Sequence, residues 1–172
     1  MKIFTPFVIA TNIYDVDLSF YDKYGIKFIL CDLDNTLDAY YQKTPTKQAK
    51  DFVKKLKEHG IELIVVSNNN DKRVSLYTNE LGARYISRSG KPFACKTKKF
   101  LKENEIDKNL CIAIGDQVFT DVVYANKLKI KSILCDNLVS KDQFVTRINK
   151  FFDKYFRKVL KKRNKLINWK EK

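Results

Sequence analysis

The chain has 172 residues, 44% of them hydrophobic, which allows one domain with its own core and excludes a low-complexity protein. The formal net charge is +14, and residues 141–172 hold most of the excess, with twelve Lys or Arg against three Asp or Glu. The four cysteines show no CxxC spacing, which excludes zinc-ribbon and thioredoxin-type motifs and favours reduced thiols.

The first 27 residues form a lead-in to the predicted domain. Their apolar stretch is short and is broken by Pro6, so it fits neither a signal peptide nor a membrane span. No other apolar run approaches the roughly 20 residues that a spanning helix needs. We therefore expect a cytoplasmic protein, at most peripheral at the inner face of a membrane. A helix is predicted near residues 17–24, and Gly25 ends it.

The middle of the chain alternates between predicted strands and helices. Continuous apolar runs bounded by polar residues are typical of buried parallel strands, and they occur at 27–31, 61–66, 84–86, 110–114 and 131–135. Helices are predicted from Thr44-Pro45 to Gly60, over 71–81, after Pro92 with Phe93 on its apolar side, and from Thr120 to about 129. This order predicts an α/β fold, a doubly wound parallel sheet with helices on both faces.

Residues 141–172 are predicted as an amphipathic basic helix and tail that pack on a core formed by residues 1–140. One helical face collects apolar residues: Phe144, Ile148, Phe151, Phe152, Tyr155 and Val159. The opposite face collects cations: Arg147, Lys150, Lys154, Arg157, Lys158 and Lys161. The basic face either meets solvent or contacts an anionic surface such as a membrane, and both interpretations remain open.

Polar side chains follow successive strands, at the edge where parallel strands present their carboxyl ends. In chain order they are Asp32 with Asp34, Ser67, Lys91, and Asp116 with Asp121. Each has an ordinary explanation by itself, as a cap or a surface residue. Together they suit a phosphate and a magnesium ion: one carboxylate attacks phosphorus, a second exchanges a proton, and the lysine and hydroxyl neutralise phosphoryl oxygens.

Four motifs in this order resemble the phosphatases of the haloacid dehalogenase (HAD) superfamily. They are residues 32–37, the apolar run ending at Ser67, Lys91-Pro92, and residues 115–121. Pro6, residues 13–18, Gly25-Ile26-Lys27 and the first and fourth motifs further resemble the YqeG-type proteins of subfamily IIIA, which are relatives of phosphatidylglycerophosphate phosphatases. That resemblance implies a substrate, phosphatidylglycerophosphate, and a product, phosphatidylglycerol.

The resemblance also implies a role for each site residue. Asp32 is the nucleophile and Asp34 the general acid/base, while the phosphate is held by Ser67, Asn68 and Lys91. Asp116 binds Mg²⁺ together with Asp32 and the backbone carbonyl of Asp34, and Asp121 supports the metal site. Asp38 departs from the family pattern, which has an apolar residue there.

The spacing of the motifs leaves no room for a large cap domain. Residues 37–45 are too few, and residues 67–91 hold one helix and one strand. An open site suits a bulky or lipid-borne phosphate, or else it needs an oligomer to close it. The sequence does not fix the oligomeric state.

Other functions stay open at this point. The enzyme alternative is a phosphatase for a soluble sugar phosphate, a nucleotide or a phosphorylated nucleic-acid end. A receiver domain is disfavoured because no aspartate ends the predicted strand at 61–66. The charge permits a basic RNA- or ribosome-binding protein, but no aromatic-plus-basic RNA motif occurs, so nucleic acid is not an expected partner.

Overall fold

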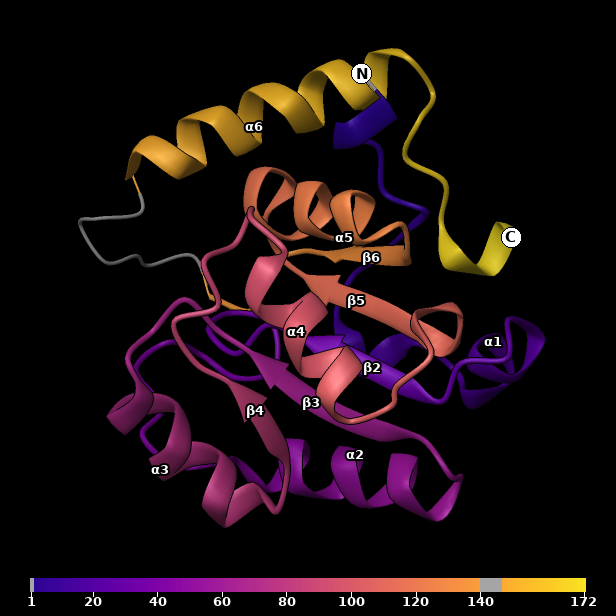
Figure 1. The fold of residues 1–172 in the computed structure, drawn as a ribbon. Helices are drawn as coiled ribbons and strands as arrows, with labels where there is room; N and C mark the ends of the chain where they lie inside the picture. Colours follow the sequence, from indigo (N-terminus) through magenta and orange to yellow (C-terminus); the bar gives the residue numbers. More distant parts are fainter. Residues whose placement is uncertain (1, 140–146) are drawn as a thin grey trace.

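The protein is built on a six-stranded, wholly parallel sheet with the strand order β1-β6-β5-β2-β3-β4 (Figure 1). This computed structural model describes residues 2–139 and 147–172. The strands are β1 (Val8–Ala10), β2 (Phe28–Cys31), β3 (Glu62–Val66), β4 (Arg84–Ile86), β5 (Cys111–Gly115) and β6 (Lys131–Cys135). The helices are α1 (Leu18–Lys23), α2 (Lys47–Glu58), α3 (Asp71–Leu81), α4 (Cys95–Glu103), α5 (Val123–Leu128) and α6 (Arg147–Lys162).

Helices cover both faces of the sheet. Successive side chains of a strand point to opposite faces, so the apolar strands need a helical layer on each side. Cys31 packs into a core with apolar residues of α1, α2 and α3. Its neighbour Leu30 packs on the other face with residues of α4 and α5. A third cluster joins α6, through Leu160, to Leu134 of β6 and to Val118. The predicted doubly wound α/β fold is therefore confirmed.

The five predicted strands form within one residue of their expected bounds, but a sixth strand was missed. Strand β1 has only three residues, in the segment that the sequence marks as a lead-in. It pairs with β6 at one edge of the sheet, and the backbone N–H of Ile9 also donates to the carbonyl of Ile167 at 2.8 Å. The partners of β1 lie more than 120 residues away in the sequence, and three residues are too few to show a strand-like alternation of apolar and polar side chains.

Three helix starts differ from their predicted positions, and one of them is that of α5, which begins at Val123 rather than at Thr120. Helix α2 is capped by Thr46, whose hydroxyl accepts from the N–H of Ala49, so Thr44 is not the cap. Helix α4 begins at Cys95, and Phe93 lies before it and is 66% exposed, which corrects its predicted place on the apolar side. A π-helical segment, Val118–Val122, precedes α5 and turns Asp121 inward.

Helix α6 packs by a different face from the predicted one. Phe152 and Tyr155 are 48% and 58% exposed, whereas Phe156 stacks on Phe4 with ring centroids 4.3 Å apart and Leu160 is buried. The predicted apolar residue Phe144 lies outside the described residues, and so do the side chains of Ile148 and Phe151. Along the described chain, no helix is long and apolar enough to cross a membrane.

Asp38, which departs from the family pattern, is a buried anchor. Its carboxylate accepts from the N–H and hydroxyl of Thr46, both at 2.9 Å, and from the hydroxyl of Tyr77 at 2.6 Å. The hydroxyl of Tyr14 donates nearby, to the carbonyl of Leu37. These bonds tie the loop after β2 to the start of α2 and to α3.

Replacing Asp38 by Ala leaves three donors without their acceptor: the N–H and hydroxyl of half-buried Thr46 and the hydroxyl of buried Tyr77. We expect Asp38→Ala to lower the free energy of unfolding by about 2–3 kcal/mol. Urea unfolding measures the loss. Asp17→Ala is the matched control, because Asp17 is exposed and makes no side-chain cap bond, and it should change stability by less than about 0.5 kcal/mol. Equal losses in the two variants would contradict the anchoring role.

Candidate active site

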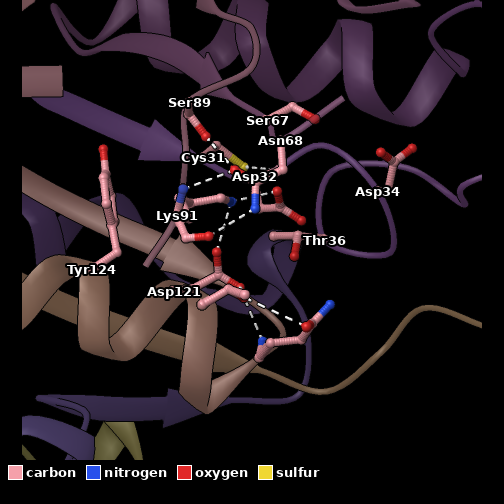
Figure 2. A network of polar contacts seen from close by, with 12 residues as sticks. Cys31, Asp32, Asp34, Thr36, Ser67, Asn68, Ser89, Lys91, Asp121 and Tyr124 are labelled. Carbon is pink, nitrogen blue, oxygen red and sulfur yellow. Dashed lines mark hydrogen bonds and ion pairs between the residues drawn. The ribbon is translucent and has the colours of Figure 1, made fainter. Parts of the chain in front are cut away.

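Parallel strands bring the predicted site residues to one edge of the sheet. The register pairs Cys31 of β2 with Val65 of β3 and with Ile114 of β5, so all three strands end at the same level. The ladder continues one residue further, where the N–H of Asp32 donates to the carbonyl of Ile114 at 2.9 Å. Asp32, Ser67 and Asp116 therefore follow neighbouring strand ends at one level. Lys91 arrives from the turn after β4 and lies beside Asp32 (Figure 2).

The side chain of Lys91 lies between two carboxylates. Its Nζ is 2.6 Å from Asp32 Oδ1 and 2.7 Å from Asp121 Oδ1, and only 3% of the side chain is exposed. Burial by itself lowers the pKa of Lys91, but Asp121 and Asp32 more than offset it and raise the pKa above its ordinary value. The ammonium therefore stays charged, and it holds one oxygen of each carboxylate in place.

Three carboxylates form a cluster that suits a divalent cation. Ligand oxygens of Asp32, Asp116 and Asp121 lie within 4.8 Å of one another. Asp116 Oδ1 accepts a long bond, 3.4 Å, from Thr36, while its Oδ2 is buried and has no hydrogen-bond partner among the described residues. Hard cations such as Mg²⁺ take oxygen ligands of this kind, so the donor set fits the predicted metal.

Burial makes two carboxyl groups of the cluster, Asp32 and Asp116, unusually reluctant to ionise. It raises the pKa of Asp32 to about 7, against the partial opposition of Lys91. The pKa of Asp116 is raised well above its usual value, first by burial and then by repulsion from Asp32 and Asp121. One lysine cannot neutralise three carboxylates, and a cation beside them favours their charged forms.

Gly115 makes room for the fourth motif to fold back on itself. A Cβ at this position would lie 2.2 Å from Cγ of Asp121, so only glycine allows that side chain to cross the end of β5. The Asp121 carboxylate is further held by the N–H of Gln117 at 3.1 Å and by the hydroxyl of Thr120 at 3.3 Å. The π-helical turn and Gly115 together aim Asp121 at Lys91.

Asn68 fixes the backbone around Lys91. Its Oδ1 accepts from the N–H of Lys91 and from the hydroxyl of Ser89, both at 2.8 Å, and its Nδ2 donates to the Lys91 carbonyl at 3.0 Å. Ser67 is buried, and its Oγ accepts from the N–H of Asn69 at 3.1 Å. Phosphate binding by Ser67, Asn68 and Lys91 stays a prediction. The contacts of Asn68 show in addition that it positions the backbone of Lys91.

Asp34 stands apart from the carboxylate cluster, as Figure 2 shows. Its Oδ2 accepts from Asn69 Nδ2 at 2.5 Å and its Oδ1 from Arg73 Nη2 at 3.2 Å. Burial raises the pKa of Asp34, and Arg73 pulls it back only in part. A carboxyl group with a raised pKa, two residues beyond Asp32 and separate from the acids around Lys91, has the properties of a proton donor.

The cluster opens into a pocket of about 610 Å³. Asp32 and Lys91 lie in it together with Asp34, residues 40–43 of the loop after β2, residues 67–70 and Arg73. No inserted domain covers this edge in the part of the chain that the structure describes.

Sequence reasoning missed a brace that α6 places on the fourth motif. Arg157, predicted on the solvated face, donates through Nη2 to the carbonyls of Asp116 and Cys135, both at 2.7 Å. Its Nε donates at 2.7 Å to Asp153, whose other oxygen accepts from the N–H of Val118 at 2.5 Å. Helical periodicity finds the amphipathic faces, but it does not tell which face meets the strand ends.

Comparisons with known proteins agree with the fold and with the type of site. Residues 1–140 match the family model described as mitochondrial PGP phosphatase. The Bacillus subtilis (strain 168) protein named Probable phosphatase YqeG is 33% identical over 170 residues, 99% of this chain and 98% of that protein. Phosphatidylglycerophosphate phosphatase 1, chloroplastic/mitochondrial, of Arabidopsis thaliana is 24% identical over 83% of this chain and 44% of its own length.

A solved structure resembles the chain in fold. The 3-deoxy-D-manno-octulosonate 8-phosphate phosphatase from Yersinia pestis has a TM-score of 0.51 and 14% identity, covering 74% of this chain and 83% of that one. At this level of identity, the likeness extends to the architecture of the sheet and its helices.

The raised carboxyl pKa values predict that Mg²⁺ stabilises the protein more at high pH. Asp32 and Asp116 bind protons more strongly folded than unfolded, so the metal-free protein loses stability as pH rises from about 4 to about 7. Thermal unfolding should show a Mg²⁺-induced rise in Tm of about 5–10 °C at pH 8 and clearly less at pH 5.5.

Asp116→Asn tests whether the effect comes from this cluster. The variant removes one charge and one ligand oxygen, so its Mg²⁺-induced shift should largely disappear at pH 8, with EDTA-treated protein as the baseline. A wild-type shift of equal size at the two pH values would contradict the assignment.

Proposed function

The chain belongs to the mitochondrial PGP phosphatase family and is a HAD-type phosphatase, and from this we propose that it removes the terminal phosphate of phosphatidylglycerophosphate in a Mg²⁺-dependent reaction. The observation that supports the site most strongly is the buried Lys91 ammonium between Asp32 and Asp121, near an Asp116 oxygen that has no hydrogen-bond partner among the residues described. This arrangement offers charge compensation for a phosphoryl group and an oxygen ligand for a cation.

In the first half of the reaction, a carboxylate oxygen of Asp32 attacks phosphorus and forms an aspartyl-phosphate. The bond from phosphorus to the ester oxygen breaks, and its electron pair stays on that oxygen. Asp34 donates its proton to the departing oxygen, for which its raised pKa suits it. Lys91, with Ser67 beside it, binds the phosphoryl oxygens and compensates their negative charge.

In the second half, Asp34 takes a proton from water, and the water oxygen attacks phosphorus. The bond from phosphorus to Asp32 breaks, which restores the carboxylate and releases inorganic phosphate. Asp32, Asp116 and the backbone carbonyl of Asp34 would hold Mg²⁺, with Asp121 in support. A cation bound there would neutralise charge on these acids and on the phosphoryl group.

The lipid substrate is supported by the family and by the relative from Arabidopsis thaliana, whose name states that activity. The shape of the site is compatible with it, because an uncapped pocket leaves space for a leaving group that stays attached to acyl chains.

Phosphate release from a substrate panel tests this proposal. Phosphatidylglycerophosphate in mixed micelles should be hydrolysed with a higher kcat/KM than soluble sugar phosphates or nucleotides, and EDTA should abolish turnover. Asp32→Asn should reduce kcat by at least about 10³-fold, because no nucleophile remains. Circular dichroism checks that the variant is folded. A clear preference for a soluble substrate would reject the lipid, and full activity in Asp32→Asn would reject the mechanism.

Helix α6 provides a surface for peripheral contact with an anionic membrane. Phe152 and Tyr155 are exposed on it, and exposed cations surround them, including Lys154 and Lys158. Apolar insertion together with charge attraction is the usual basis of such binding. Because Asp153 bonds to Val118 of the fourth motif, a membrane on this surface would lie close to the site.

Vesicle co-sedimentation tests the contact. Vesicles containing phosphatidylglycerol should bind the protein more strongly than phosphatidylcholine vesicles, and added salt should weaken the binding. Tyr155→Ser should reduce binding severalfold, whereas Leu76→Ser on α3 should not, although Leu76 is 56% exposed. Similar losses in both variants, or no preference for the anionic vesicles, would exclude α6 as the membrane surface.

A further inference from the structure

Arg73 is a cation in the site pocket, and the proposed reaction assigns it no role. It is the third residue of α3 and forms part of the wall beside Asp34. Among the residues that line this pocket, the only other cations are Lys91, which is engaged by two carboxylates, and Lys43. Of these three pocket cations, Arg73 is the one that forms an ion pair with Asp34, the proposed proton donor.

The structure holds the Arg73 guanidinium in a fixed place. Its Nη2 donates to Asp34 Oδ1 at 3.2 Å, and its Cζ lies over the ring of Tyr77, 5.5 Å from the ring centroid. Tyr77 is itself held by its hydrogen bond to Asp38. A side chain that is 21% exposed and lies over an anchored ring is preorganised to receive a ligand.

The guanidinium also has unused donors. An arginine carries five N–H groups in a planar fork, and Nη1 of Arg73 is buried without a hydrogen-bond partner within residues 2–139 and 147–172. A single 3.2 Å contact to Asp34 leaves most of the charge-assisted bonding capacity of this group unsatisfied. An anionic oxygen in the pocket would supply the missing acceptor after a small rotation of the fork.

The position of Arg73 shows which part of a substrate it would meet. In the proposed reaction Asp34 protonates the ester oxygen, so the leaving group passes beside Asp34. Arg73 touches Asp34, and it therefore faces the atoms that follow this oxygen. A neutral leaving group gives the guanidinium no acceptor, whereas a phosphodiester a few bonds away gives two anionic oxygens that match its fork.

We propose that Arg73 binds a second anionic group on the leaving side, the phosphodiester of the substrate, and thereby selects phosphomonoesters that carry such a diester. The inference rests on the proposed function for the position of the scissile phosphate. It adds a specificity-determining residue and a chemical rule: the preferred substrate has two phosphorus centres joined by a short polyol.

Two water-soluble substrates test this rule without a membrane. One is glycerophosphoglycerol phosphate, the deacylated headgroup with both a monoester and a diester, and the other is glycerol 3-phosphate, which has the monoester alone. Wild-type protein should show a kcat/KM about 10- to 100-fold higher for the first. Arg73→Gln should reduce this preference to within about threefold, and Arg73→Lys should retain part of it.

Lys72→Gln is the matched control, because it removes the same charge one residue away from an exposed position. It should keep the wild-type preference. If Arg73 acts only by orienting Asp34, Arg73→Gln will slow both substrates by the same factor and leave their ratio unchanged. That result, or a wild-type protein without preference for the diester, overturns the inference.

A binding measurement separates this inference from the proposed function. Glycerophosphoglycerol carries the diester but no monoester, and titration calorimetry with Mg²⁺ and inorganic phosphate present should show about tenfold weaker binding to Arg73→Gln. If the lipid is not hydrolysed but the diester is bound through Arg73, the lipid substrate is wrong and the subsite stands. If the lipid is hydrolysed while the two proteins bind the diester equally, the subsite is wrong and the function stands.

Discussion

The buried Lys91 ammonium is the interaction on which the rest of the site depends. It lies in contact with Asp32 and Asp121, and burying any of these charges alone would cost several kcal/mol or more. The surrounding structure therefore has to hold them within hydrogen-bond distance of one another. Asn68 clamps the Lys91 backbone, and Gly115 lets Asp121 cross the end of β5.

One lysine among three carboxylates leaves an excess of negative charge, and this excess gives the site its chemistry. In the part of the chain that the structure describes, Asp116 Oδ2 is buried and has no hydrogen-bond partner, which is costly in a folded protein unless a ligand satisfies it. Catalytic sites often keep such groups at the expense of stability. Away from the cluster, Asp34 accepts a hydrogen bond from the Asn69 amide and forms an ion pair with Arg73, so its surroundings differ from those of the three acids around Lys91.

The arrangement of the site residues could be predicted from the sequence because it depends on the order and direction of the strands. Parallel strands end at a common edge, so residues after successive apolar runs had to converge there, as Asp32, Ser67 and Asp116 do. Contacts between distant segments left no such signal. The pairing of β1, the buried face of α6 and the cap at Thr46 rather than Thr44 each depend on partners outside the local pattern. Arg157 belongs to the same group, because the two acceptors of its Nη2 are backbone carbonyls, which any sequence provides.

The brace formed by Arg157 also bears on how the enzyme is made. The strands that carry Asp32 and Asp116 are complete by residue 115, and chains are synthesised from the N-terminus at about 5–20 residues per second. The carbonyl of Asp116 receives its bond from Arg157 only after 41 further residues have been added. A nascent chain still attached to the ribosome therefore holds an unbraced fourth motif until α6 has emerged and docked. Maturation of the site is thus coupled to synthesis of a helix that supplies none of the described residues lining its pocket.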